Sequence, residues 1–268
     1  MAHLRYVKTA EEVKASREGG AEFLESTVRS IRIVYETDPA LHAAAIPQPL
    51  EPADRPEMSV TLSHVAMKIT PEFTFEIGSA VFGARARYDG AEGTYLITMP
   101  MTTEAAVVGG RETFGEPKKI AEIPFSRDGG RVSCSVTRMG IPYIQAEGTL
   151  GAAGQPRQFT EHAWCIKAFP SCQQGVDFDA DPLLVRLDWR HDHRAVHRID
   201  GGSLTLTDSP FDPVADLPVR RITCMEYEEG TTQSNGTVLR PLPADWVLPF
   251  LHGRYDEMGV VGVEVGAE

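Results

Sequence analysis

The clearest pattern along this chain is the alternation of apolar and polar side chains. Residues 30–35 place Ile31, Ile33 and Tyr35 on one face, and residues 132–137 repeat the same period with valine and cysteine. A period of two indicates β-strands that are buried on one face only.

Further segments rich in β-branched and aromatic residues predict additional strands. These segments cover residues 59–69, 73–88, 94–99, 143–150, 159–169, 183–189, 202–206 and 219–227. Glycine, proline and asparagine separate many of them. Short, numerous strands between turn residues are typical of a β-barrel or a β-sandwich.

Few helices are predicted. Residues 8–18 favour a short amphipathic helix or an ordered arm, and residues 39–45 favour a helix with Asp38 as its N-cap and a proline at its first position. A third helix is expected over residues 103–108, and a last one within residues 244–256. We therefore expect helices to be accessory elements around a β-structure.

Size and composition indicate an ordinary globular domain. The chain has 268 residues, of which 42% are hydrophobic, enough to bury a sizeable core. There is no internal repeat, low-complexity tract or obvious linker. We therefore interpret residues 1–268 as a single domain, in which residues 1–25 form an N-terminal helix or arm.

Charge narrows the possible partners. A formal net charge of -12 disfavours nucleic acid and anionic membrane surfaces, both of which attract basic proteins. No apolar run reaches the length of a membrane span, and the first residues lack a signal-peptide pattern. The four cysteines, Cys134, Cys165, Cys172 and Cys224, form no Cys-x-x-Cys pair. We expect reduced cysteines and a cytoplasmic protein.

Three histidines lie close together in the sequence, at His191, His193 and His197. A strand would place the first two on one face, where they could ligate a metal if a third ligand converged on them. The charged residues between them favour a solvated loop or a subunit contact instead. We therefore predict neither a metal site nor a cofactor.

The run from Gly110 to Lys119 carries the most specific chemistry. It ends in two adjacent lysines, Lys118 and Lys119, directly after Pro117. Repulsion between two neighbouring ammonium groups favours the neutral amine of one of them. A neutral lysine amine attacks a ketone and forms a Schiff base, which acts as an electron sink for carbon–carbon bond chemistry.

This run resembles the active-site signature of the acetoacetate decarboxylase superfamily, which has Gly-Arg-Glu followed by Pro-Lys-Lys at the same spacing. Weaker similarity covers Ile33–Asp38, Ile46–Glu51, Glu76–Ala80 and Asp216–Val219. The resemblance implies a mainly β (α+β) fold with open, curved, barrel-like antiparallel sheets and a few short helices. It also implies a homo-oligomer, a tetramer or larger, without a cofactor.

The resemblance implies roles for individual residues. Lys118 would be the Schiff-base nucleophile and Lys119 the neighbouring cation, while Glu76 would hold Lys119 in its charged form. The family also uses an arginine to meet the substrate carboxylate. Arg29 is the nearest match but is displaced by one residue, which on a strand means the opposite face, so Arg32 is the alternative.

Two departures from the family pattern bear on the reaction. Glu116 stands where decarboxylases carry an aromatic residue, and residues 61–63 lack their second glutamate. Glu116 can serve as an acid or base, and Tyr255 can add a hydroxyl. We therefore expect aldolase-dehydratase or hydratase chemistry on a small 2-oxo acid such as pyruvate. The alternatives are a β-keto acid decarboxylase of the acetoacetate type and an inactive relative that binds a ligand.

Overall fold

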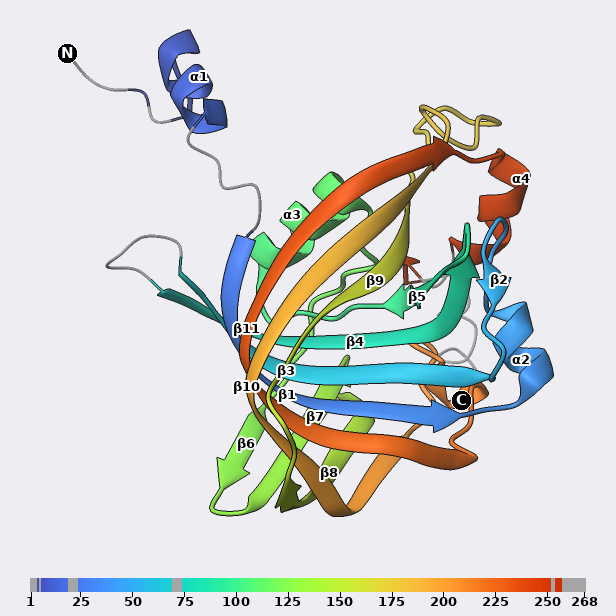
Figure 1. The fold of residues 1–268 in the computed structure, drawn as a ribbon. Coiled ribbons are helices and arrows are strands. Elements are labelled where there is room, and N and C mark those ends of the chain that lie inside the picture. Colours follow the sequence, from blue (N-terminus) through green and yellow to red (C-terminus); the bar gives the residue numbers. More distant parts are fainter. Residues whose placement is uncertain (1–3, 5, 19–23, 69–73, 252–253, 257–268) are drawn as a thin grey trace, which may run out of the picture.

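The computed structural model describes residue 4 and residues 6–18, 24–68, 74–251 and 254–256. Within them, eleven strands form one curved sheet (Figure 1). The strands are β1 (Leu24–Glu36), β2 (Glu51–Pro52), β3 (Glu57–Lys68), β4 (Thr74–Tyr88), β5 (Ala91–Thr98), β6 (Phe125–Asp128), β7 (Arg131–Arg138), β8 (Ile141–Ala153), β9 (Arg157–Lys167), β10 (Leu183–Leu206) and β11 (Arg221–Pro241).

The strand order closes part of this sheet into a barrel. Neighbours follow the order β11-β1-β3-β4-β5-β9-β10, and β10 pairs back onto β11. The contact between β5 and β9 is parallel, whereas the pairings between the other strands of the barrel are antiparallel. The mainly β, barrel-like architecture expected from the sequence is confirmed.

Strands β6, β7 and β8 extend from the far half of β10 and form a second layer (Figure 1). The sequence predicted separate strands over residues 183–189 and 202–206, with a solvated loop or a subunit contact between them. The prediction of a loop was wrong, because β10 runs unbroken from Leu183 to Leu206. Residues 189–198 are paired with β11, so the three histidines lie on a strand.

Helices lie at the margins of the sheet. They are α1 (Ala10–Glu18), α2 (Pro39–Ala44), α3 (Glu104–Phe114) and α4 (Ala244–Val247), with the 3₁₀ turns η1 (Val214–Asp216) and η2 (Leu248–Phe250). Asp38 caps α2 as predicted, since its Oδ1 accepts hydrogen bonds from the backbone N–H groups of Ala40 and Leu41. Helix α3 extends further than predicted, to Phe114. Gly115 is its C-cap and adopts the left-handed conformation, with a φ of 75°.

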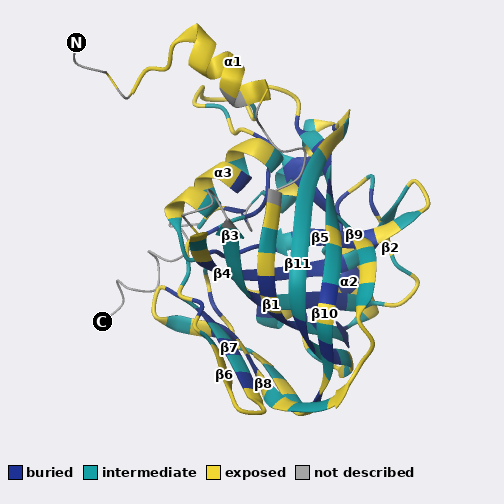
Figure 2. Ribbon diagram, turned by 60° about the vertical axis from the view of Figure 1, so that its left-hand side comes forward, coloured by how far each residue is buried: buried dark blue, intermediate teal, exposed yellow. Residues whose placement is uncertain are grey.

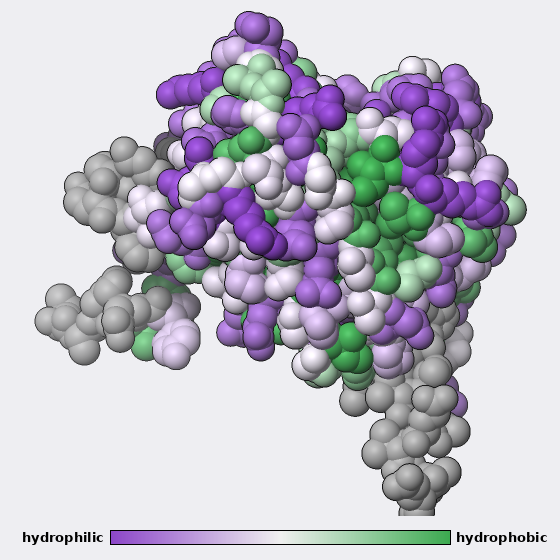
Figure 3. All heavy atoms as spheres, turned by 90° about the horizontal axis from the view of Figure 1, so that it is seen from below, coloured by the Kyte–Doolittle hydropathy of each residue, from purple (hydrophilic) through white to green (hydrophobic). Residues whose placement is uncertain are grey.

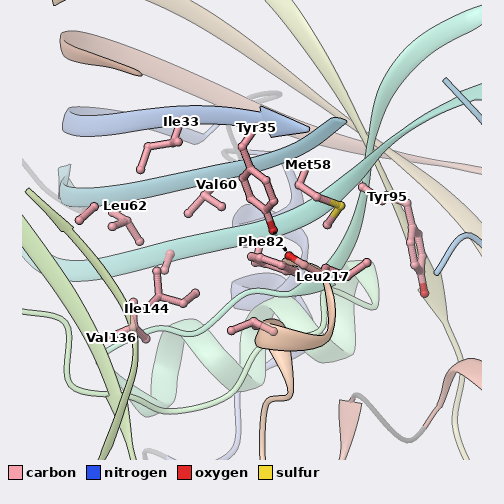
Figure 4. Close-up of a cluster of buried hydrophobic side chains, with 14 of the residues drawn as sticks. Ile33, Tyr35, Met58, Val60, Leu62, Phe82, Tyr95, Val136, Ile144 and Leu217 are labelled. Carbon is pink, nitrogen blue, oxygen red and sulfur yellow. Dashed lines mark hydrogen bonds between the residues drawn. The ribbon is translucent and has the colours of Figure 1, made fainter. Parts of the chain in front are cut away.

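The two faces of β1, β3 and β4 have different neighbours. On one face, Ile33, Val60 and Phe82 are fully buried in the main core with side chains of β7 and β8 (Figure 4). Dark blue marks the buried positions along the strands in Figure 2. The hydroxyl of the buried Tyr35 donates a hydrogen bond of 2.8 Å to the carbonyl of Leu217. The residues that alternate with these along β1, β3 and β4 face the barrel interior, where the candidate site lies.

The outer surface mixes polar and apolar residues. Seen from below, purple hydrophilic side chains lie between several green apolar areas, the most extended of them to the right of the centre (Figure 3). In the described part of the chain, no helix has the length and apolar character needed to cross a membrane. All four cysteines are free.

Candidate active site

A cavity of about 370 Å³ lies between helix α3 and the interior face of the barrel. Its apolar side is formed by side chains such as Met99, Met101 and Phe114, and its strand side carries many hydroxyl groups. The cavity has the size of a small-molecule binding site, for which about 300–1,000 Å³ is usual.

Lys118 and Glu116 form an ion pair in the wall of this cavity. The Nζ atom of Lys118 lies 2.7 Å from Oε2 of Glu116, and the two side chains are only 12% and 7% exposed. The pair packs directly against Gly110 on helix α3, where an added methyl group would overlap the Glu116 carboxylate and come within 2.6 Å of Lys118 Nζ. A glycine at this point of the signature therefore allows the helix to approach the pair.

Lys119 belongs to a different environment. Its Nζ atom donates to the carbonyl of Phe211 at 2.8 Å and lies 3.1 Å from carboxylate oxygens of both Asp212 and Asp256. Arg138 binds the same two aspartates, so two cations face two anions in a buried cluster. Lys119 is not among the described residues that line the cavity. The two lysines project to separate sets of partners.

Glu76 does not reach either lysine. Its side chain is 66% exposed and lies 3.6 Å from Nε2 of His64. Its neighbour Ile77 lines the cavity instead, because successive strand residues point to opposite faces. The expectation that Glu76 holds Lys119 charged was wrong in this structure, since Asp212 and Asp256 take that place.

The strand alternation also separates the two candidate arginines. Arg29 is exposed and lies outside the cavity lining, whereas Arg32 lines the cavity with a side chain that is 20% exposed. The expectation that Arg29 faces the site was wrong, because a displacement by one residue reverses the face of a strand. Thr61 and Ser63 also face the cavity, while Leu62 points into the main core.

Tyr255 lies beside the signature rather than in the cavity lining. Its ring is 5.0 Å from the guanidinium of Arg111, and that guanidinium donates to the carbonyls of Lys118 at 2.9 Å and Arg254 at 3.0 Å. Arg254 in turn donates to the carbonyl of Gly115 at 3.0 Å. Burial lowers the pKa of Arg254 below its ordinary value. Residues 254–255 thus fix the backbone of the lysine segment.

The sequence analysis considered Arg32, His191 and His193 separately but did not predict that they belong to one polar group in the cavity lining. We call this group the polar wall; its members are Arg32, Phe159, Glu161, His191, His193, Glu228 and Thr232, and all of them line the cavity. The rings of Phe159 and His191 are stacked at 4.8 Å, and His191 Nδ1 is 3.0 Å from the hydroxyl of Thr232. Alternation of side chains along β10 could have indicated which of these residues share a face. That argument holds only if residues 190–198 form a strand.

Each imidazole of this wall faces a carboxylate. His191 Nε2 is 3.6 Å from Glu161, and His193 Nδ1 is 3.4 Å from Glu228. Burial opposes the ionisation of Glu228, but His193 and the guanidinium groups of Arg32 and Arg157 outweigh it and lower its pKa to about 2.

Burial likewise opposes ionisation of Glu161, while His191, Arg32 and Arg85 lower its pKa below the ordinary value. Both carboxylates of the polar wall are therefore ionised at neutral pH. In the described ranges, no group of three or more His, Cys, Asp or Glu side chains is arranged to hold a metal ion.

Known proteins give an independent comparison. Residues 10–242 match the family described as acetoacetate decarboxylase (ADC). Acetoacetate decarboxylase 1 of Bradyrhizobium diazoefficiens is 26% identical over 220 residues, which cover 77% of this chain and 82% of that protein. The acetoacetate decarboxylase of Clostridium beijerinckii is 28% identical over 200 residues, covering 72% and 77%.

Solved structures share the fold. The acetoacetate decarboxylase of Legionella pneumophila has a TM-score of 0.67 at 19% identity, covering 83% of this chain and 90% of that one. The enduracididine biosynthesis enzyme MppR, complexed with pyruvate, has a TM-score of 0.70 at 15% identity, covering 83% and 92%. At these identities the similarity concerns the fold alone.

Proposed function

Because this chain belongs to the acetoacetate decarboxylase family, we propose that it is a lyase that forms a Schiff base between Lys118 and a small 2-oxo acid. The observation that carries the proposal is the buried contact of 2.7 Å between Lys118 and Glu116 in the cavity wall. We propose aldol and dehydration or hydration chemistry for the later steps, with pyruvate as the simplest substrate.

The pair can generate its own nucleophile. Moving one proton along the contact from Lys118 to Glu116 converts an ion pair into a neutral amine and a carboxylic acid. In a buried site this exchange removes two charges from a medium that solvates them poorly. Lys119 is then not required as the repelling cation, because its ammonium group is compensated by Asp212 and Asp256.

Schiff-base formation follows from this state. The amine adds to the keto carbon, losing a proton to Glu116 as the acid proton of Glu116 passes to the keto oxygen. A second proton transfer from Glu116 releases that oxygen as water and leaves the protonated imine beside the Glu116 carboxylate. In sum, the lysine ammonium and the ketone give the imine cation and water.

The same carboxylate serves the carbon chemistry. Glu116 removes a proton from the carbon next to the imine, which gives an enamine and a protonated Glu116. The enamine carbon attacks the carbonyl carbon of an aldehyde, and Glu116 returns its proton to the aldehyde oxygen. Loss of that hydroxyl as water and hydrolysis of the imine complete an aldol-dehydration cycle.

Decarboxylation of a β-keto acid is the second candidate, and the names of the relatives at 24–28% identity favour it. It needs the imine but no carboxylate for proton abstraction from carbon. The contact between Glu116 and the lysine supports the aldol alternative.

Reduction with borohydride tests Schiff-base formation, the step that both candidate reactions share. After incubation with pyruvate or acetoacetate, peptide mass spectrometry is expected to find the reduced adduct on Lys118, and Lys118→Arg is expected to abolish it. Lys167→Arg is the matched control, since Lys167 lies on β9 and bonds the carbonyl of Thr113. An unmodified Lys118 with both acids would contradict the proposal.

The later steps are distinguished by their products. Carbon dioxide is measured with acetoacetate, and condensation products are measured with pyruvate and an aldehyde. Glu116→Gln is expected to lower condensation by about 10²–10⁴-fold, the usual contribution of a positioned acid–base group. Glu112→Gln, an exposed change on α3, is the control.

A further inference from the structure

The cavity is larger than the reaction at Lys118 requires. Its volume of about 370 Å³ lies in the range used for drug-sized ligands, so a three-carbon oxo acid bonded to Lys118 would leave most of it unfilled. The polar wall borders the same cavity. A substrate with a longer chain would therefore extend toward it.

The polar wall and the charged residues that pair with it, Arg85, Arg157 and Glu226, are neutral when taken together. Arg32, Arg85 and Arg157 contribute three positive charges, and Glu161, Glu226 and Glu228 contribute three negative charges when the imidazoles are counted as neutral. Arg32 is the guanidinium that lines the cavity and is available to the carboxylate of the oxo acid. The wall then has no spare cation for a second anionic group.

The wall nevertheless offers hydrogen bonds. The ionised carboxylates of Glu161 and Glu228 accept, and the hydroxyl of Thr232 both donates and accepts. These three side chains line the cavity, so an apolar chain placed against them would leave polar groups without a hydrogen-bond partner.

Resting on the proposed function, we propose that the polar wall is a second subsite that binds an uncharged, hydroxylated chain. The substrate class is a 2-oxo acid whose end remote from the carboxylate carries hydroxyl groups, or the adduct of pyruvate with a hydroxylated aldehyde. Hydroxyls match the wall because each can donate to Glu161 or Glu228 and accept from His191 or Thr232. Dicarboxylic oxo acids are excluded by the two ionised glutamates.

Two probes of equal net charge and six-carbon length test the subsite. They are 2-oxohexanoate, which has an apolar chain, and 2-keto-3-deoxygluconate, which has a hydroxylated one. Calorimetry on the Lys118→Ala protein measures binding without the covalent step. The hydroxylated probe is expected to bind at least about tenfold more tightly, the effect of about one net hydrogen bond.

Variants then locate the effect. Thr232→Val and His191→Leu are expected to remove most of this preference while changing the binding of 2-oxohexanoate less than threefold. Thr231→Val is the matched control, because Thr231 is the neighbouring threonine on β11 and is not among the residues that line the cavity.

The outcomes separate the two proposals. Equal binding of both probes, or an equal loss for both in the Thr232→Val and His191→Leu proteins, would overturn the subsite. A clear preference for the hydroxylated probe supports the subsite even if borohydride traps no adduct on Lys118, and that second result would overturn only the proposed function.

Discussion

Lys118 and Lys119 are adjacent in the chain, yet their ammonium groups contact different carboxylates. Lys118 meets Glu116 in the cavity wall, and Lys119 meets Asp212 and Asp256 in a buried cluster. In an extended segment successive side chains point to opposite sides, so a Lys-Lys pair does not place its charges together. Glu116, and not Lys119, is therefore the charged group in contact with Lys118.

The cluster around Lys119 is expected to support stability. Asp212→Ala would leave Lys119 and Arg138 without their most buried partner, and breaking such a pair costs about 3–5 kcal/mol. Urea unfolding measures the loss, and Asp208→Ala, an exposed change in the same loop, is the control. Equal unfolding free energies for the two variants would show that the cluster adds nothing to stability.

Gly110 is expected to be required for the geometry of the Lys118–Glu116 pair, which we propose to be catalytic. Gly110→Ala would push Lys118 and Glu116 apart and lower kcat at least tenfold. Gly109→Ala adds the same methyl group where no heavy atom lies within 4 Å, so it is expected to retain kcat. Replacing a helical glycine by alanine also gains about 1 kcal/mol in helix propensity. Equal kcat values for both proteins would contradict the close packing.

Arg32 is expected to bind the substrate carboxylate in place of Arg29. Removing a charge-assisted contact in Arg32→Met would raise KM for an oxo acid about ten- to hundredfold. Arg29→Met removes the same group from the exposed face and is expected to leave KM unchanged. Steady-state kinetics of the two proteins side by side decide the point, and a larger effect at Arg29 would reverse the assignment.

Glu228 is expected to make folding sensitive to acid. Its pKa is about 2 in the folded state against an ordinary value of 4.5, so the unfolded chain binds more protons between these values. Its contribution is fully present above about pH 4.5 and is lost as the pH falls toward 2. Since one pKa unit corresponds to about 1.4 kcal/mol, the contribution is about 3 kcal/mol.

Unfolding free energies of the wild type and Glu228→Gln measured across this pH range check the sign. The wild type is expected to lose more stability than the variant on acidification, whereas Glu92→Gln, an exposed change, is expected to follow the wild type. Parallel curves for the wild type and Glu228→Gln would contradict the expectation.

The sequence by itself determined most strands of the barrel, the cap of α2 and the lysine signature, because these depend on local alternation and on fixed spacing along the chain. It also named Lys118 and Glu116, which lie two residues apart. It did not predict the middle of β10 or the second half of β11. Only the tertiary structure decided which carboxylates meet Lys119, that Glu76 and Arg29 face away from the cavity, and that His191 and Glu228 line the same cavity as Lys118. Those relationships join residues far apart in the chain through strand register and parity, and a single-residue shift reverses them.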